Sequence, residues 1–304
     1  MTPGTLPSAS PSPEAAARRG AGHSFVATLE MIRFSHTLFA LPFALLAAVL
    51  AANGLAPAGT LVKILLAMVG ARSAAMAHNR LVDRHIDAAN PRTSSRALPA
   101  GVLSVTYVRI FLAASSLLFL AAAASLNRLT LILAPVALAL LFFYAYTKRF
   151  TWLSHAVLGL CLAIAPVGAW IAVLGRLDWV PVLLGLAVLL WTAGFDLLYA
   201  LQDEEHDRRV GLFSIPARWG ARRSLLISAL LHAAMLPLLI GVWRLSGGGV
   251  LFAVGIAATA LALLYQHAIV RPGDLSRVNT AFFTANGFVS VTLAAFGIAD
   301  VFLR

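Results

Sequence analysis

Two short polar clusters hold the residues of this sequence that are best suited to chemistry. Their members recur every three or four residues: Asn79, Asp83 and Asp87 in the first cluster, and Asp196, Tyr199, Asp203 and Asp207 in the second. On an α-helix, side chains at these intervals lie along one side. Each cluster therefore predicts a stripe of oxygen atoms near the end of a helix.

Magnesium is the cation that these stripes fit best. Carboxylates one turn apart repel each other, yet the pair Asp83 and Asp87 recurs 120 residues later as Asp203 and Asp207. Oxygen ligands without a His or Cys set favour Mg²⁺ over zinc or copper. Mg²⁺ is commonly held by one or two carboxylates together with substrate phosphates. The sequence thus predicts a diphosphate bridged by Mg²⁺ between two similar helical units.

An alternative interpretation is that these acidic residues are only solvated and paired with nearby arginines. The arginines available for such pairs are Arg80, Arg84, Arg208 and Arg209. Asp196 argues against this interpretation because it lies inside an apolar run. A carboxylate within a membrane segment is costly and usually marks a functional site.

Basic residues near the clusters could bind the remainder of an anionic substrate. Arg and Lys both bind phosphate oxygens, and four of them are expected to do so here: Arg92, Arg96, Lys148 and Arg149. Arg33 and Arg72 lie within apolar runs and are candidates for binding a small carboxylate. The alternative explanation for Arg92, Arg96, Lys148 and Arg149 is that they only follow the positive-inside rule. The alternative for Arg33 and Arg72 is that their side chains extend to the membrane interface.

The composition indicates that the helices carrying these residues lie in a membrane. Of the 304 residues, 60% are hydrophobic and 12% are charged, whereas soluble domains carry about 25% charged residues. The mean hydropathy is +0.87, which excludes a soluble globule and a disordered chain. The single cysteine, Cys161, excludes disulfides and multi-cysteine metal sites. Membrane topology also explains the net charge of +11 without a nucleic-acid partner.

Nine apolar runs follow a polar leader at residues 1–22, and residues 23–304 form one transmembrane domain. The predicted helices are 25–52, 58–78, 102–125, 129–147, 152–174, 179–200, 222–243, 248–270 and 278–302. With the N-terminus in the cytoplasm, 18 of the 23 Lys and Arg residues fall on the cytoplasmic side, as the positive-inside rule requires. We therefore expect an all-α bundle of about nine spans in the bilayer, with a disordered cytoplasmic leader.

The two clusters resemble the Asp-rich motifs of the UbiA superfamily of intramembrane aromatic prenyltransferases, NDxxDxxxD and DxxYxxxDxxxD. The second motif matches at all four positions, whereas the first has Arg80 where the family commonly has Asp. Residues 87–101 resemble the family loop DAxNPRTxxRxLPxG, and Tyr146-Thr-Lys-Arg149 resembles a further family segment. Within the superfamily the sequence is most similar to the 4-hydroxybenzoate polyprenyltransferases and enzymes like them.

This resemblance implies a UbiA-type bundle around a central cavity in a bacterial inner membrane. It implies Mg²⁺-dependent transfer of a polyprenyl group from an isoprenyl diphosphate to 4-hydroxybenzoate, in ubiquinone biosynthesis. The metal ligands would be Asn79, Asp83, Asp87, Asp196, Asp203 and Asp207, and the catalytic residues Asp83, Lys148, Tyr199 and Asp203. The aromatic acceptor would bind near Arg33 and Arg72.

Three alternatives remain at the level of sequence. The same chemistry on a dihydroxynaphthoate would serve menaquinone biosynthesis, and Arg80 leaves the acceptor open. A cation-coupled transporter could also use Asp196 and the paired halves, although transporter sites usually lie near the bilayer midplane. A CDP-alcohol phosphotransferase is disfavoured because its DGxxAR pattern is absent from the sequence.

Overall fold

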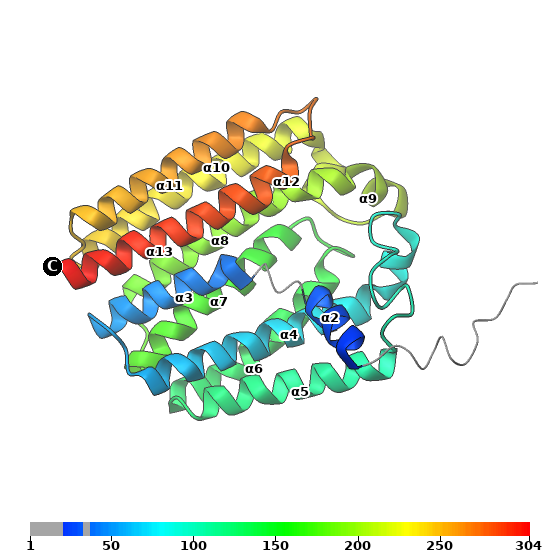
Figure 1. The fold of residues 1–304 in the computed structure, drawn as a ribbon. Helices are drawn as coiled ribbons and strands as arrows, with labels where there is room; N and C mark the ends of the chain where they lie inside the picture. The colour runs from blue at the N-terminus through cyan, green and yellow to red at the C-terminus, as the bar shows by residue number, and fades with distance from the viewer. Residues whose placement is uncertain (1–20, 33–36) are drawn as a thin grey trace, which may run out of the picture.

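The computed structural model describes residues 21–32 and 37–304, and all of its regular elements are helices (Figure 1). The long elements are α2 (Ala21–Met31), α3 (Thr37–Ala52), α4 (Ala58–Ala89), α5 (Val105–Ala124), α6 (Arg128–Thr147), α7 (Ser154–Leu174), α8 (Trp179–Ala200), α10 (Ile215–Leu245), α11 (Val250–Ile269) and α13 (Asn286–Leu303). The short elements are η2 (Leu201–Asp203), α9 (Glu204–Val210), α12 (Val278–Thr280) and η3 (Ala281–Ala285).

Eight helices in the described residues are long and apolar enough to cross a membrane, and Phe39–Ala52 forms a shorter apolar helix. The chain is therefore a multi-pass integral membrane protein. The first predicted span, 25–52, is not one helix but two, α2 and α3. The sequence between them contains Arg33, Ser35 and His36, which interrupt the apolar run. The predicted leader, 1–22, lies outside the described residues except for the first two residues of α2.

One helix extends further than its apolar run, and another is preceded by a short helical turn. The predicted second span ends at residue 78, but α4 continues to Ala89 and carries the first acidic cluster on its last turns. α10 begins at Ile215, where the Ser214 side chain accepts a hydrogen bond from the N–H of Ala217, but its backbone leaves helical geometry at Gly220 (φ 73°, ψ 172°). The uninterrupted part of α10 therefore begins close to residue 222, where the seventh span is predicted. Polar residues can extend a helix past the apolar run because its backbone hydrogen bonds are internal.

The helices pack around a large core between α3, α7, α8, α10, α11 and α13, whose fully buried side chains include Phe43, Trp191 and Phe252. In Figure 1, α4, α5 and α6 lie together on the other side of α7. Glycine allows the central helices to approach closely: a Cβ at Gly159 of α7 would lie 2.4 Å from the main-chain oxygen of Leu189 on α8. This close contact fixes α7 against α8 and so positions the polar residues at their ends.

We expect Asp300 to stabilise the fold from the end opposite the acidic clusters. Its buried carboxylate accepts hydrogen bonds from the N–H groups of Gly249, at 2.8 Å, and Phe252, at 3.3 Å. Asp300→Ala leaves these two N–H groups at the start of α11 without their partner, at a cost of about 2 kcal/mol. Thermal unfolding in detergent micelles should show a Tm lower by several degrees. Glu205→Ala, which removes a carboxylate that is 86% exposed, should leave the Tm unchanged.

Candidate active site

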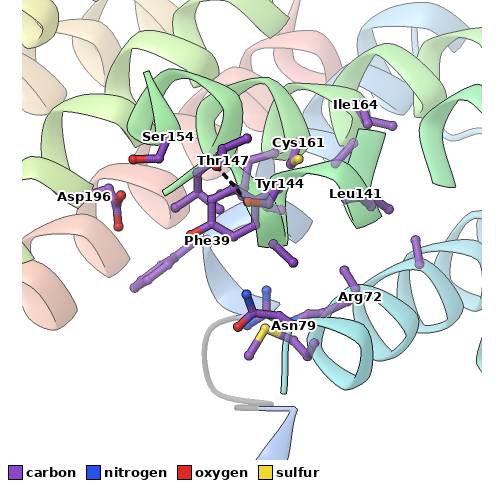
Figure 2. A pocket seen from close by; sticks show the side chains of 18 of the residues that line it. Phe39, Arg72, Asn79, Leu141, Tyr144, Thr147, Ser154, Cys161, Ile164 and Asp196 are labelled. Carbon is purple, nitrogen blue, oxygen red and sulfur yellow. Dashed lines mark hydrogen bonds between the residues drawn. The ribbon is translucent and has the colours of Figure 1, made fainter. Parts of the chain in front are cut away.

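The two acidic clusters line one pocket of about 490 Å³. Its polar end is lined by residues from α4, the loop after α4, the segment after α6, α8, η2 and α9: Asn79, Arg80, Asp83, Asp87, Asn90, Arg92, Arg96, Lys148, Asp196, Tyr199, Asp203 and Asp207. The second cluster is not on a single α-helix as predicted, because α8 ends at Ala200 and Asp203 and Asp207 lie on η2 and α9. Figure 2 shows Arg72 and Asn79 on α4, with Tyr144, Ser154 and Asp196 on the opposite side of the pocket. The fold thus brings together residues that lie more than 100 positions apart in the sequence.

Asp83 is buried at the centre of the first stripe, and it is held by two cations from the segment after α6. The Nζ atom of Lys148 lies 2.6 Å from Oδ2 of Asp83, and Nη2 of Arg149 lies 3.1 Å from Oδ1. The amide of Asn79 donates a hydrogen bond to Oδ2 at 3.3 Å. Arg149 contacts Asp83 from the rim, whereas Lys148 lines the pocket itself.

Asp87 lies one turn further along α4 and is also buried. Its Oδ1 accepts a hydrogen bond from Nη1 of Arg96 at 2.6 Å. Its Oδ2 lies 3.5 Å from Nη1 of Arg80 and has no hydrogen-bond partner among the described residues. Arg80 is thus a buried countercharge of this stripe. A buried carboxylate oxygen without a hydrogen bond retains a lone pair that a metal ion can use.

Asp203 connects the second stripe to the first half of the chain through Arg92. The guanidinium of Arg92 donates to both carboxylate oxygens of Asp203, with 2.8 Å between Nε and Oδ1, and also donates to the hydroxyl of Tyr199 at 3.1 Å. Burial disfavours the charged form of Arg92, but the hydrogen bonds to Asp203 and Tyr199 outweigh this effect and raise the pKa of Arg92. Arg92 is therefore a permanent cation between the two clusters.

The remaining predicted residues lie at different depths. Asp207 lines the polar end of the same pocket. Asp196 lies further into α8, and its Oδ2 lies 2.7 Å from Nδ1 of His155 rather than beside an Arg or Lys. Arg72 lines the pocket two turns before Asn79 on α4. Arg33 lies outside the described residues.

An apolar section continues from the polar end along α4, α5, α6 and α7. It is lined mainly by alanines and larger aliphatic side chains, among them Ile64, Ala71, Leu126, Ala134 and Ile171. The lining on α4 runs from Asp87 back to Ile64, which is about 35 Å at the helical rise. That length is similar to the thickness of the hydrocarbon core. The pocket therefore joins a charged end to an apolar channel.

The donor set of the polar end fits Mg²⁺ better than a softer metal. Within the described residues, no three His, Cys, Asp or Glu side chains lie close enough together to hold one ion. An ion at Asp83, Asp87, Asp203 or Asp207 would need further ligands from substrate and water, which is how Mg²⁺ is commonly bound. The arginines and lysine now paired with the carboxylates are suited to phosphate oxygens. The site therefore fits a substrate that brings its own anionic oxygens.

His155 is a pocket residue that the sequence interpretation missed. It lies at the start of α7, is buried and lines the pocket beside Ser154. The only signal in the sequence is a Ser-His pair directly before an apolar run. The pairing of His155 with Asp196 depends on the packing of α7 against α8, which spacing along the chain does not encode.

Comparison with known proteins agrees with this geometry. Residues 40–288 match the UbiA prenyltransferase family. The chain is 31% identical over 255 residues to a 4-hydroxybenzoate octaprenyltransferase of Nitrosospira multiformis, covering 84% of this chain and 87% of the relative. The apo structure of a UbiA homologue from Aeropyrum pernix K1 is 35% identical, with a TM-score of 0.79, and the match covers 87% of this chain and 98% of that one.

A second solved structure shares the fold at lower identity. A UbiA homologue from Archaeoglobus fulgidus, bound to GPP and Mg²⁺, is 24% identical with a TM-score of 0.69, and the match covers 90% of this chain and 99% of that one. The family match spans most of the chain, and the Nitrosospira relative exceeds 30% identity over most of both sequences. This chain therefore belongs to the UbiA prenyltransferase family and is a prenyltransferase similar to 4-hydroxybenzoate octaprenyltransferase.

Proposed function

We propose that this enzyme transfers a polyprenyl group from an isoprenyl diphosphate to the ring of 4-hydroxybenzoate and releases diphosphate, with Mg²⁺ as cofactor. The observation that carries the proposal is the union of a charged end and an apolar channel in one pocket. A prenyl diphosphate has the same two parts, an anionic head and a long apolar tail. The name of the Nitrosospira relative supports 4-hydroxybenzoate as acceptor, and the Archaeoglobus structure supports Mg²⁺ beside a prenyl diphosphate.

The metal ligands in this proposal are Asp83, Asp87, Asp203 and Asp207, supported by Asn79 and Asp196. Bound there, Mg²⁺ supplies positive charge to the diphosphate. Four basic residues bind the other diphosphate oxygens: Arg92, Arg96, Lys148 and Arg149. Three of the stripe carboxylates hold these cations in the pocket or, for Arg149, at its rim before substrate arrives. Groups positioned in advance lower the barrier for a step in which negative charge develops.

The reaction replaces one bond by another at the allylic carbon. The C–O bond to diphosphate breaks, a C–C bond forms to the ring carbon ortho to the hydroxyl, and the proton on that carbon passes to the released diphosphate. Tyr199, whose hydroxyl accepts a hydrogen bond from the diphosphate-binding Arg92, is proposed to hydrogen-bond the leaving group, and its ring packs against Phe282 with 4.3 Å between centroids. Aromatic faces stabilise an allylic cation through cation–π attraction. Arg72, deeper in the pocket, is proposed to bind the carboxylate of the acceptor, together with Arg33.

We place the enzyme in the bacterial inner membrane with the charged end of the pocket at the cytoplasmic face. The positive-inside distribution of Lys and Arg supports this orientation. Soluble diphosphates and hydroxy acids would then enter from the cytoplasm, and the lipid tail would lie in the bilayer. The product fits ubiquinone biosynthesis, or menaquinone biosynthesis where the acceptor is a dihydroxynaphthoate.

The experiment that tests the function uses membranes that contain the protein, Mg²⁺ and octaprenyl diphosphate. 4-Hydroxybenzoate and a dihydroxynaphthoate are supplied in parallel, and mass spectrometry detects the prenylated acid. We expect product from 4-hydroxybenzoate, and its loss when EDTA removes Mg²⁺. Product from the dihydroxynaphthoate alone would show that the acceptor is the dihydroxynaphthoate and not 4-hydroxybenzoate. No product from either acceptor, with diphosphate intact, would contradict prenyl transfer and favour a transporter.

A further inference from the structure

A π-helical turn, η3 (Ala281–Ala285), interrupts the last candidate membrane span next to the pocket. The main-chain N–H of Asn286 donates to the carbonyl of Phe283, whereas in an α-helix it would donate to the carbonyl of Phe282. The side-chain amide of Asn286 donates to the carbonyl of Phe282 instead, at 2.8 Å. Turns of this kind are rare and occur frequently at functional sites. Phe282 is the residue of this turn that lines the pocket.

Two buried amides, Gln266 on α11 and Asn286, hold the turn from behind the pocket lining. Nε2 of Gln266 donates to the carbonyl of Ala281 at 3.0 Å and lies 3.3 Å from Oδ1 of Asn286. The indole N–H of Trp191 on α8 donates to the same Oδ1 at 3.1 Å. Gln266, Asn286 and Trp191 are fully buried, and none of the three lines the pocket. Because buried polar groups are costly unless they are hydrogen-bonded, this network favours a single geometry of the turn.

Phe282 transmits this geometry to Tyr199. The centroids of these two rings lie 4.3 Å apart, and Phe282 also packs against Phe39 at 5.6 Å and Phe195 at 5.4 Å. All four rings line the pocket. Tyr199 lies in the last turn of α8, and its hydroxyl accepts a hydrogen bond from Arg92 at 3.1 Å. The Tyr199 side chain is therefore held at its ring by Phe282 and at its hydroxyl by Arg92.

We propose that Gln266 is a positioning residue for prenyl transfer: through the π-helical turn it places Phe282, and Phe282 orients Tyr199 so that its hydroxyl meets the leaving diphosphate. This inference rests on the proposed prenyl transfer and extends it to a residue behind the pocket lining. The alternative is that the amide network only stabilises the fold. Loss of the network would then lower the stability of the protein without acting through Tyr199.

The test is a double-mutant cycle between Gln266→Met and Tyr199→Phe. Methionine has about the length of glutamine but no N–H donor, and phenylalanine lacks only the hydroxyl of tyrosine. The values of kcat and of KM for octaprenyl diphosphate are measured in membranes, with 4-hydroxybenzoate and Mg²⁺ saturating and the protein amount matched.

We expect Gln266→Met and Tyr199→Phe each to lower kcat roughly tenfold and to change KM by less than about twofold, because an oriented hydroxyl acts on the transition state. In the Tyr199→Phe background, Gln266→Met should lower kcat by less than a further factor of about two, because the hydroxyl that it orients is already gone.

A matched control removes a buried hydrogen bond that does not lead to Tyr199. Ser228 on α10 is fully buried and donates to the carbonyl of Gly194 on α8 at 2.6 Å, and neither residue lines the pocket. Ser228→Ala should lower the Tm in detergent micelles by several degrees, as Gln266→Met does, but should keep kcat within about twofold of wild type.

Phe282→Leu tests the same inference with both amides in place, so the result does not depend on the folding of Gln266→Met. It should lower kcat in the wild-type background and have little further effect in the Tyr199→Phe background.

The outcomes distinguish this inference from the function on which it rests. A wild-type enzyme that forms no product contradicts the proposed prenyl transfer. If the wild type forms product, an equal loss of kcat for Gln266→Met and Phe282→Leu with and without the Tyr199 hydroxyl assigns the network to stability alone and overturns the inference. A wild-type kcat in Tyr199→Phe also overturns it, because Tyr199 would then have no contribution to transmit.

Discussion

Replacing Asp83 with Asn is expected to lower the rate of prenyl transfer roughly 1000-fold at saturating Mg²⁺, because a metal-bound charge contributes several kcal/mol to such a step. Asp83 is buried between Asn79, Lys148 and Arg149. The amide keeps the size of the side chain but loses the negative charge that holds both Mg²⁺ and the two cations in place. The measurement is the initial rate of product formation in membranes, with the protein amount matched.

A matched control for this variant is Glu205→Gln, the same chemical change at a side chain that is 86% exposed and paired with Arg209. We expect it to retain at least about half of the wild-type rate, because exposed ion pairs contribute little. Asp203→Asn, in the opposite stripe, should match Asp83→Asn, since Arg92 loses its bidentate partner. A rate for Asp83→Asn within about threefold of wild type would show that the first stripe does not take part in the reaction step.

The membrane-spanning helices could be predicted from the sequence because apolar runs of about 20 residues report directly on burial in lipid. The ends of the helices could not be predicted in the same way. α4 continues through Asp83 and Asp87 because its polar residues face the pocket or basic partners, so they do not stop the helix. The division of residues 25–52 into α2 and α3 was missed because Arg33, Ser35 and His36 were included in one long run with the apolar residues on both sides of them.

Spacing along a helix is local, and it correctly indicated that Asn79, Asp83 and Asp87 share one side of α4. The contacts between segments are not local. Arg92 reaches Asp203 across 111 residues, and His155 reaches Asp196 across 41. Both depend on how α7 and the loop after α4 pack against α8, which periodicity does not report. The burial of Arg80 beside Asp87 also could not be predicted from the sequence. The roles of all these residues in catalysis stay predictions.

Gly168 offers a way to test whether the apolar channel holds the isoprenoid tail. It lies on α7, lines the pocket, and a Cβ built there would have no atom within 4 Å. It is 14 residues beyond Ser154, or about 21 Å along the helix from the polar end. A large side chain at this position therefore enters the channel at a defined depth while the charged end keeps its geometry.

We expect Gly168→Phe to lower the rate with octaprenyl diphosphate roughly 10- to 100-fold, since inserting bulk into a filled space costs about 1–3 kcal/mol. The tail of a short donor such as geranyl diphosphate does not reach the phenyl ring introduced at position 168. This donor should therefore react at nearly the wild-type rate. The measurement is the ratio of the two rates, which cancels differences in expression. Gly59→Phe is the control, because Gly59 also has open space around its Cβ but lies outside the pocket.

The ratio also discriminates between two locations for the tail. If the tail lies in the channel, the ratio of long-donor to short-donor rate falls only in Gly168→Phe, and donors of intermediate length mark the depth at which the block acts. If the tail instead leaves the polar end sideways into lipid, the ratio stays at the wild-type value in both glycine variants. A loss of rate with both donors in Gly168→Phe would show that α7 has shifted at its polar end, where His155 and Ser154 lie. Gly168→Ala then tests the channel with a smaller side chain, which should affect only the longest donors.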